Sequence, residues 1–326
     1  MKRRSRISAV TLAFAMVFMT LASQAVFAGG GQQKKSDGTI RIGFINAFLT
    51  TPYQAPLDAA AVKRAKELGV ELILVDGKAD SATMLSQAQS FIDQKVDAIM
   101  FVPADMAGSI TIVKAIHAAG IPVIGVNSRP DPSVENLLAT QVSCDLEYEG
   151  EVIGKLVASH FPQGGKAVTI EGFAGTEAQQ KRTAGFKKGL AGSKVEVVQE
   201  VIADWDRAKA MSAADDLITR IPDLKIIFAQ DDSMAFGAIE AVKAAGKMDQ
   251  IKVYGIGFMG DESRAYLKSG ELQGTCTQSP SYEGVTGLEL AVKVIKGEKV
   301  DAYYRTEALP VSKENADSID HGFNVN

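Results

Sequence analysis

Short apolar runs alternate with longer helical stretches from residue 38 almost to the end of the chain. The runs predict strands at 40–45, 71–75, 98–102, 122–126, 167–170, 195–201, 225–228 and 252–256. The stretches between them predict helices at 52–68, 81–94, 107–119, 147–160, 177–190, 207–220, 234–245 and 281–295. Because strands that are apolar throughout alternate with helices, we expect an α/β protein whose parallel sheets are covered on both faces.

Two segments of the chain repeat one plan. In 96–126 and again in 224–256, a strand is followed by a helix that ends in Ala-Gly, and a second strand begins shortly afterwards. The duplication predicts two similar, doubly wound lobes. Ligands of such lobes bind beyond the carboxyl ends of the strands, so the loops at those ends are where we look for function.

The first 28 residues follow a different pattern. Four basic residues lie among the first six, an apolar run follows over 7–21, and small residues lead up to Ala28. This order is typical of a signal peptide cleaved near Ala28, and it predicts export to the periplasm. The polar, Gly-rich stretch 29–38 is predicted to be a disordered N-terminus of the mature protein.

The charge balance is acidic. The chain carries 35 Lys and Arg against 39 Asp and Glu, a net charge of −4, and without the four basic residues of the leader the balance is 31 against 39, or −8. Binding to nucleic acid needs a basic face, so this balance argues against such a partner. The roughly 300 mature residues also exceed what one compact core usually holds, which favours two lobes.

Catalytic and metal-binding motifs are missing from the sequence. The three histidines, His117, His160 and His321, are scattered and lie outside ligand spacing of a cysteine or of one another. No nucleophile elbow, P-loop or Cys-His pairing is found. We therefore expect neither a metal site nor a cofactor, and no enzymatic activity.

The stretch 255–260 fits the G-x-G-x-x-G pattern of dinucleotide-binding loops and follows a predicted strand. A nucleotide site also needs an acidic ribose partner at the end of the next strand, about 20 residues further on. Here the next strand, 272–277, has only Glu271 at its start. We therefore interpret 255–260 as a strand end that lines a cleft.

Eight motifs in and near the strand-end loops occur in one order. They are Thr-Pro-Tyr at 51–53, Val-Pro-Ala-Asp at 102–105, Ile-Pro-Val at 121–123, Glu-Gly-Phe-Ala-Gly-Thr at 171–176, Ala-Asp-Trp-Asp-Arg at 203–207, Phe-Ala-Gln-Asp-Asp-Ser-Met-Ala at 228–235, Gly-Ile-Gly-Phe at 255–258 and Val-Ile-Lys-Gly-Glu at 294–298. In these motifs the chain resembles the ribose-binding protein family of periplasmic binding proteins, over nearly the whole mature length.

The resemblance implies the type I periplasmic-binding-protein fold, two doubly wound parallel-sheet lobes joined by a three-segment hinge. It places the N-terminal lobe at 39–143 plus 278–306 and the C-terminal lobe at 144–277 plus 307–326. Family members close around a monosaccharide, polyol or cyclitol, deliver it to the permease of an ABC transporter, and in some cases signal to a chemoreceptor. We therefore expect a monomeric, periplasmic solute-binding protein.

The resemblance also implies a ligand site. In the N-terminal lobe the family's stacking aromatic falls on Tyr53, with Thr51 at the preceding polar position. A polar pair that is often Asp-Arg in the family falls on Asn127 and Ser128, and Arg129 is expected to take the place of that arginine. Aromatic faces suit the C–H surfaces of a sugar, and planar polar groups suit its hydroxyls.

In the C-terminal lobe the family's sugar-binding arginine falls on Arg182, and a second stacking aromatic falls on Trp205. Replacing either by alanine is expected to weaken binding without unfolding the protein. Asp231 stands where Asn is usual, Gln278 matches its counterpart, and Met259 stands where Asp is usual. The methionine removes a hydroxyl acceptor and adds apolar surface, which argues against ribose. It favours a ligand with a deoxy or methyl edge, or a different ring whose carboxylate partner is Asp231.

Cys144 and Cys276 are the only cysteines, and the resemblance places both on or beside the crossovers between the lobes. Export permits a disulfide, but a bridge needs Cα atoms about 4.4 to 6.8 Å apart, which the sequence does not establish. Two buried thiols and a bridge that limits opening are both compatible with the sequence.

Three alternative functions share parts of this pattern. An effector-binding domain of a lactose-repressor-like transcription factor has the same fold, but the leader and the missing helix-turn-helix argue against it. A glycosidase needs two carboxylates about 5 to 9.5 Å apart around a bond, and the adjacent Asp231 and Asp232 offer no such pair. A periplasmic sensor that presents a sugar or a furanosyl signal molecule to a membrane receptor differs only in its ligand, and stays open.

Overall fold

The computed structural model describes residues 38–324. The predicted leader, 1–28, lies outside the described residues, and so does the predicted disordered stretch 29–38 apart from Gly38, which lies in a turn. Among residues 38–324, no helix is long and apolar enough to cross a membrane.

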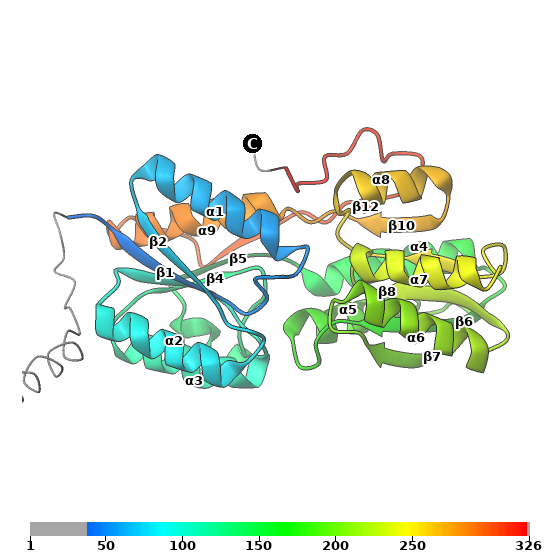
Figure 1. Ribbon diagram of the computed structural model, residues 1–326, viewed down its shortest axis with the longest axis horizontal. Coiled ribbons are helices and arrows are strands. Elements are labelled where there is room, and N and C mark those ends of the chain that lie inside the picture. The colour runs from blue at the N-terminus through cyan, green and yellow to red at the C-terminus, as the bar shows by residue number, and fades with distance from the viewer. Residues whose placement is uncertain (1–37, 325–326) are drawn as a thin grey trace, which may run out of the picture. The chain divides into compact units, whose positions relative to one another are not determined.

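Two six-stranded sheets organise the described chain. The first has the strand order β11-β5-β4-β3-β1-β2, and all its pairings are parallel. Its strands are β1 (Arg41–Asn46), β2 (Glu71–Asp76), β3 (Ala98–Val102), β4 (Val123–Val126), β5 (Thr140–Cys144) and β11 (Tyr303–Thr306). The accompanying helices are α1 (Gln54–Leu68), α2 (Ser81–Gln94), α3 (Met106–Ala118), the 3-10 helix η1 (Pro132–Leu137) and α9 (Pro280–Ile295). Figure 1 shows α1 and α9, which are far apart in sequence, together on one face of this sheet, with α2 and α3 on the other.

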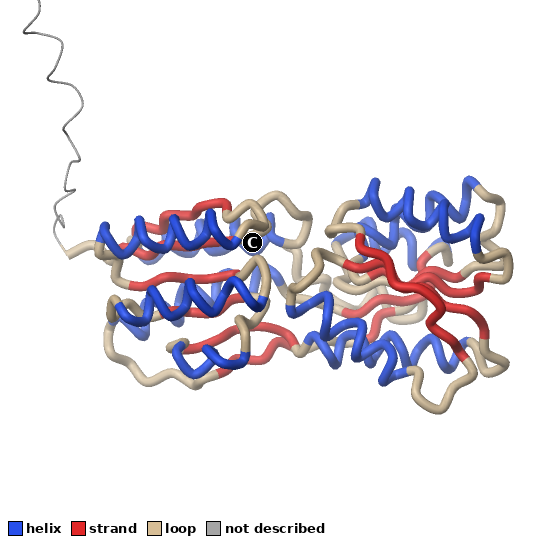
Figure 2. The backbone as a smooth tube through the Cα atoms, turned by 90° about the horizontal axis from the view of Figure 1, so that it is seen from below, coloured by secondary structure: helices blue, strands red, loops and turns tan. Residues whose placement is uncertain are grey.

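The second sheet repeats the plan with the order β12-β10-β9-β8-β6-β7. Its strands are β6 (Gly165–Glu171), β7 (Val195–Ile202), β8 (Leu224–Ala229), β9 (Lys252–Tyr254), β10 (Leu272–Cys276) and β12 (Pro310–Val311). The accompanying helices are α4 (Leu146–His160), α5 (Glu177–Gly189), α6 (Arg207–Arg220), α7 (Asp232–Ala244) and α8 (Gly260–Ser269). Only β12 runs antiparallel to its neighbour among the named strands. In Figure 2 the strands of this sheet lie between layers of helices.

The two sheets confirm the predicted fold class, a type I periplasmic-binding-protein fold with two doubly wound lobes. The chain passes from one sheet to the other after β5, returns after β10, and crosses again between β11 and β12. The residue boundaries that we gave for the lobes stay a prediction.

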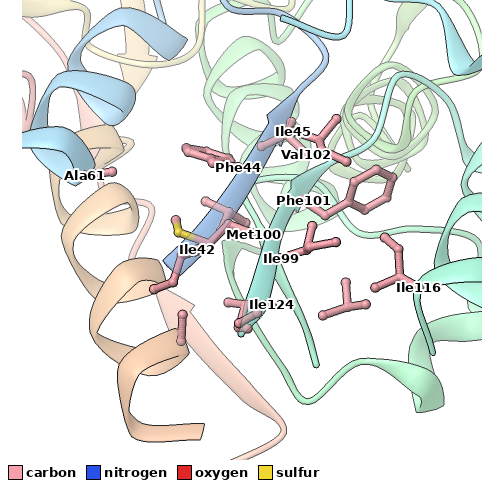
Figure 3. Packing of buried hydrophobic residues seen from close by; sticks show 14 of the residues in the cluster. Ile42, Phe44, Ile45, Ala61, Ile99, Met100, Phe101, Val102, Ile116 and Ile124 are labelled. Carbon is pink, nitrogen blue, oxygen red and sulfur yellow. The ribbon is translucent and has the colours of Figure 1, made fainter. Parts of the chain in front are cut away.

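The core of the first lobe follows from the alternation of side chains along its central strands. Ile42 and Phe44 of β1 and Met100 of β3 point toward α1 and α9, whereas Ile99 and Phe101 point to the opposite face (Figure 3). All five are fully buried. Burying such a side chain stabilises the fold by about 1.5 to 3 kcal/mol, so both faces need their helices. The strand ends are thereby held rigidly for the loops that follow them.

Candidate ligand-binding site

A small cavity lies among the loops that follow strands of both sheets. The centres of water-sized groups can occupy about 40 Å³ of it. The residues that line it are Phe48, Thr51, Tyr53, Gln54, Asn127, Ser128, Leu146, Thr176, Ala178, Arg182, Trp205, Asp231, Met259 and Gln278. Nine of the ten predicted site residues are among them, and Arg129 is the exception.

Arg182 lines the cavity from α5 and is almost completely buried. Its Nε donates to Oε2 of Glu149 at 2.8 Å, and its Nη1 donates to the backbone carbonyl of Gln230 at 2.7 Å. The guanidinium carbon also lies 5.5 Å from the centre of the Trp205 ring. Burial of a charge is costly unless it is paired, and Glu149, itself fully buried, supplies that pairing.

Trp205 reaches the cavity because of the loop between β7 and α6. Asp204 and Trp205 both have left-handed backbone conformations, with φ of 54° and 57°, and Asp206 then caps α6 by accepting from the backbone N–H of Lys209. The indole packs against the backbone of Gly172, where a Cβ would lie only 1.9 Å from the ring. A glycine at that position is therefore required for the ring to lie where it does.

The equivalent loop of the first lobe has the same geometry. Lys78 and Ala79, between β2 and α2, have φ of 55° and 52°, and Asp80 caps α2 through the N–H of Thr83. The duplication seen in the sequence thus extends to backbone conformation. Ala79 stands where the second lobe has Trp205, so only the second lobe presents an aromatic ring from this loop.

Asp231 and Gln278 complete the polar side of the cavity next to Arg182. Asp231 caps α7, where its Oδ1 accepts from the N–H of Met234 at 2.7 Å. Burial raises the pKa of Asp231 to about 7, although the charge of Arg182 partly opposes this. Gln278 donates from Nε2 to Oε1 of Glu149 at 2.9 Å. One buried carboxylate, Glu149, therefore positions both Arg182 and Gln278.

A second buried carboxylate, Glu283 on α9, positions residues on the other side of the cavity. Its Oε2 accepts from the hydroxyl of Tyr53 at 3.0 Å and from Nδ2 of Asn127 at 3.2 Å. Gln54 donates to Oδ1 of Asn127 at 3.1 Å. Burial raises the pKa of Glu283 to about 8, because hydrogen bonds from Tyr53 and Asn127 offset only part of the cost of an isolated buried charge.

Tyr53 is oriented by this network and by the C-terminal segment. Its ring meets that of Phe323 edge to face, with 5.8 Å between the ring centres. It also belongs to the buried apolar cluster of the first lobe while lining the cavity. Tyr53 is therefore both a core residue of the first lobe and a lining residue of the cavity.

Arg129 lies elsewhere. Its side chain pairs with Glu177 of α5, with 2.8 Å between Nε and Oε1, and does not line the cavity. A nearly buried carboxylate opposite it is the physical reason, since Glu177 needs a cationic partner. Arg129 therefore does not occupy the position that we expected for the second arginine.

Other contacts also join residues of the two lobes around the cavity. The rings of Phe48 and Phe173 are stacked, with centres 5.2 Å apart, and the N–H of Met106 donates to the carbonyl of Gly175 at 3.1 Å. With the Arg129 pair, these contacts join the two lobes beside the cavity.

The sequence did not point to Phe48, Gln54, Leu146, Thr176 and Ala178 as cavity residues, nor to Glu149 and Glu283 behind them. Thr176 carries a signal that could have been used, because it is the N-cap of α5 and ends the loop that follows strand β6.

Cys144 and Cys276 are buried, free thiols, so no disulfide links them. Within residues 38–324 no cluster of His, Cys, Asp and Glu could hold a metal ion.

The chain matches the periplasmic binding protein domain family over residues 42–299. The chain belongs to this periplasmic binding protein family. This periplasmic binding protein is 32% identical to the ribose import binding protein of Salmonella typhimurium over 273 residues, 84% of this chain and 90% of that one.

Solved structures are similar as well. An ABC transporter solute-binding protein from Bacillus halodurans with bound myo-inositol has a TM-score of 0.82 and 28% identity, and the match covers 86% of this chain and 98% of that one. A Mycobacterium smegmatis protein in complex with β-D-fucofuranose has a TM-score of 0.81 and 26% identity, with coverage of 86% and 93%. The periplasmic binding protein described here therefore shares its family and fold with sugar-binding components of ABC importers.

Proposed function

We propose that this protein captures one neutral monosaccharide, deoxy sugar or cyclitol in the cavity and delivers it to an ABC importer. The observation that carries the proposal is that one cavity collects aromatic rings and planar hydrogen-bonding groups from both lobes, among them Tyr53, Trp205, Arg182 and Gln278. Rings of this kind cover the C–H faces of a sugar, and the planar groups bind neighbouring hydroxyls. Contacts from both lobes at once stabilise the closed form when the ligand is present.

The charges of the lining residues favour a neutral ligand. The charged lining residues are Arg182 and Asp231, and the charge of Arg182 is already balanced by Glu149. An anionic ligand, such as a sugar phosphate, would place its charge next to Asp231 without an unpaired cation to receive it. The myo-inositol and β-D-fucofuranose in the similar structures are neutral ring compounds too.

We also propose that the mature protein is exported, is a monomer and has no enzymatic activity. The leader predicted at 1–28 supports a mature protein in the periplasm, where the importer's permease is its partner. Contact with a chemoreceptor would use the same closed form.

The test is a thermal-shift screen of the mature protein against pentoses, hexoses, deoxy sugars, polyols and cyclitols. A ligand at 100 times its dissociation constant adds about 2.7 kcal/mol to stability, which a melting curve resolves. Gln278→Ala should lose most of the shift, and Gln273→Ala, a control on the neighbouring strand β10 away from the cavity, should keep it. If no compound shifts the melting curve and mass spectrometry of the denatured protein finds no co-purified ring compound, the proposal is wrong.

A further inference from the structure

The hydrogen-bonding groups around the cavity are unevenly available. On the side of the first lobe, the donors of Tyr53, Gln54, Asn127 and Thr51 already donate to protein acceptors. Their acceptors are Glu283, Asn127 and the carbonyl of Phe48. Among the polar lining residues of this lobe, Ser128 alone has a side chain without a hydrogen bond to another described residue. The hydroxyl donors of Tyr53 and Thr51 are therefore used before any ligand arrives, whereas Gln54 and Asn127 each keep a second amide N–H.

The second lobe has free groups. Arg182 uses Nε and Nη1 for Glu149 and Gln230, which leaves Nη2 without a partner among the described residues. Asp231 uses Oδ1 to cap α7 and keeps Oδ2, and Gln278 uses Nε2 and keeps Oε1. Arg182 is adjacent to both, since it shares Glu149 with Gln278 and its Nη1 donates to the carbonyl of Gln230, the residue before Asp231. The three side chains therefore form one polar edge with a donor and two acceptors.

Three lining side chains, Phe48, Tyr53 and Met259, form an apolar edge. Phe48 and Tyr53 belong to the buried apolar cluster of the first lobe, and Met259, which reaches over from the second lobe, packs against that same cluster. Phe173 stacks on Phe48 and adds to this surface. A thioether and aromatic carbons offer no strong partner to a hydroxyl.

From these two edges we infer that the ligand is a ring whose hydroxyls are bound by Arg182, Asp231 and Gln278, and which carries a deoxy or methyl group against Phe48 and Met259. The inference rests on the proposed function and narrows its ligand class. A hydroxyl placed on the apolar edge would lose its water without gaining a partner, which lowers affinity about 10- to 100-fold. A methyl or methylene group there gains apolar contact instead.

The experiment is isothermal titration calorimetry with pairs of sugars that differ by a single hydroxyl: D-galactose and D-fucose, L-mannose and L-rhamnose, and D-ribose and its deoxy derivatives. In at least one pair the deoxy member should bind about tenfold more tightly than its parent. Met259→Gln, which keeps the length of the side chain, should reduce that ratio at least fivefold, and Met259→Leu, the apolar control, should preserve it. Helical content and melting temperature of both variants exclude a folding defect.

The outcomes separate the inference from the proposed function. If parents bind as tightly as deoxy members in every pair, or Met259→Gln leaves the ratio unchanged, the apolar edge does not select the ligand and the inference is overturned while the transport function stands. If none of these sugars binds and no neutral ring compound co-purifies, the proposed function itself fails, and the inference fails with it.

Discussion

Arg129 and Glu177 form an ion pair between segments that belong to different sheets. Arg129 follows β4 of the first sheet, and Glu177 begins α5 beside the second. Besides the pair between their side chains, the backbone N–H of Arg129 donates to Oε2 of Glu177 at 2.6 Å, and the Arg129 guanidinium lies 5.7 Å from the ring centre of Tyr303. Burial raises the pKa of Glu177 and the charge of Arg129 partly opposes this, so the carboxylate depends on its partner from the other lobe. The pair therefore stabilises the closed arrangement even without a ligand.

Replacing Glu177 by Gln should open the unliganded protein. Arg129 is one-third exposed, so the lost charge interaction is worth about 1 kcal/mol at most. This corresponds to a decrease of about threefold to fivefold in the closed population and in ligand affinity. Small-angle scattering should record a larger radius of gyration without ligand. Glu135→Gln is the control, since Glu135 lies 3.7 Å from the same guanidinium but within the first lobe. Equal scattering curves for the two variants would refute this role of the pair.

Arg182→Ala should destabilise the fold as well as weaken binding. The pair with Glu149 is almost completely buried on both sides, so removing the guanidinium leaves a buried carboxylate without its cationic partner. Gln278 still donates to Glu149, but the buried charge has no cation to balance it. Such a loss lowers the free energy of unfolding by about 3 to 5 kcal/mol, measurable by urea denaturation. The expectation from the sequence, that this variant loses binding alone, therefore has to be revised.

A double variant separates the two effects of Arg182. Arg182→Met combined with Glu149→Gln removes both charges and keeps an acceptor for Gln278, so it should recover most of the stability while ligand binding stays weak. If the single Arg182→Ala variant unfolds at the same urea concentration as the wild type, Glu149 is not the buried partner that the structure places there.

Most of the fold could be predicted because the capping residues and the pattern of apolar positions indicate the same helices and strands. Helices α2 and α6 have the predicted bounds, since Asp80 and Asp206 cap their first turns. Strand β5 was not predicted because its residues Thr140, Gln141 and Ser143 are polar, and they are buried only because β4 and β11 pair on either side. Helix α8 is short and polar, and its sequence carries no apolar stripe that would predict it.

The cavity residues that could be predicted are those that the resemblance to the family located. Asn127, Asp231 and Gln278 follow strand ends, and Arg182 lies on α5. Glu149 and Glu283 lie within helices and read as solvent-facing acids, because their partners are remote in sequence: Arg182 is 33 residues from Glu149, and Tyr53 is 230 residues from Glu283. Ligand binding by the lining residues stays a proposal.

Glu283 should make the protein less stable at alkaline pH. Its pKa is raised from 4.5 to about 8 by burial, so the folded state holds the proton more tightly than the unfolded chain. The stability that this group contributes is complete below the unfolded pKa, near 4.3, and is lost as pH rises through about 8. Glu283→Gln, which resembles the protonated form, should exceed the wild type at about pH 9 by about 1 to 3 kcal/mol in urea denaturation.

The control for Glu283 is Glu289→Gln on the same helix, where the carboxylate is partly exposed and pairs with Arg64. That variant should follow the wild-type pH profile. A profile of Glu283→Gln that falls as steeply as the wild type between about pH 5 and pH 9 would show that Glu283 is not the titrating group.

Asp231 should make ligand affinity depend on pH near neutrality. Its pKa is about 7, and a ligand hydroxyl needs the ionised carboxylate as its acceptor. Affinity should therefore fall as pH drops below about 7, by up to about tenfold per pH unit, because binding and proton release are linked. Asp231→Asn should abolish this dependence while still capping α7. Asp204→Asn, outside the cavity lining, should retain the wild-type dependence, and identical slopes for both variants would contradict the assignment.

Gly172→Ala should disturb the site without changing any residue that lines it. The new methyl group would lie 1.9 Å from carbons of the Trp205 ring, so the indole must move, and its contact with Arg182 moves too. We expect at least a tenfold loss of affinity, since a displaced aromatic wall is worth about 1.4 kcal/mol or more. Trp205 is the chain's only tryptophan, so its fluorescence spectrum reports the displacement directly. Gly165→Ala is the control, because a methyl group there meets only the flexible side chains of Lys225 and Ile226. Unchanged emission and affinity in Gly172→Ala would mean that the indole does not rest on this backbone, and that its place in the cavity wall is set by something other than the glycine.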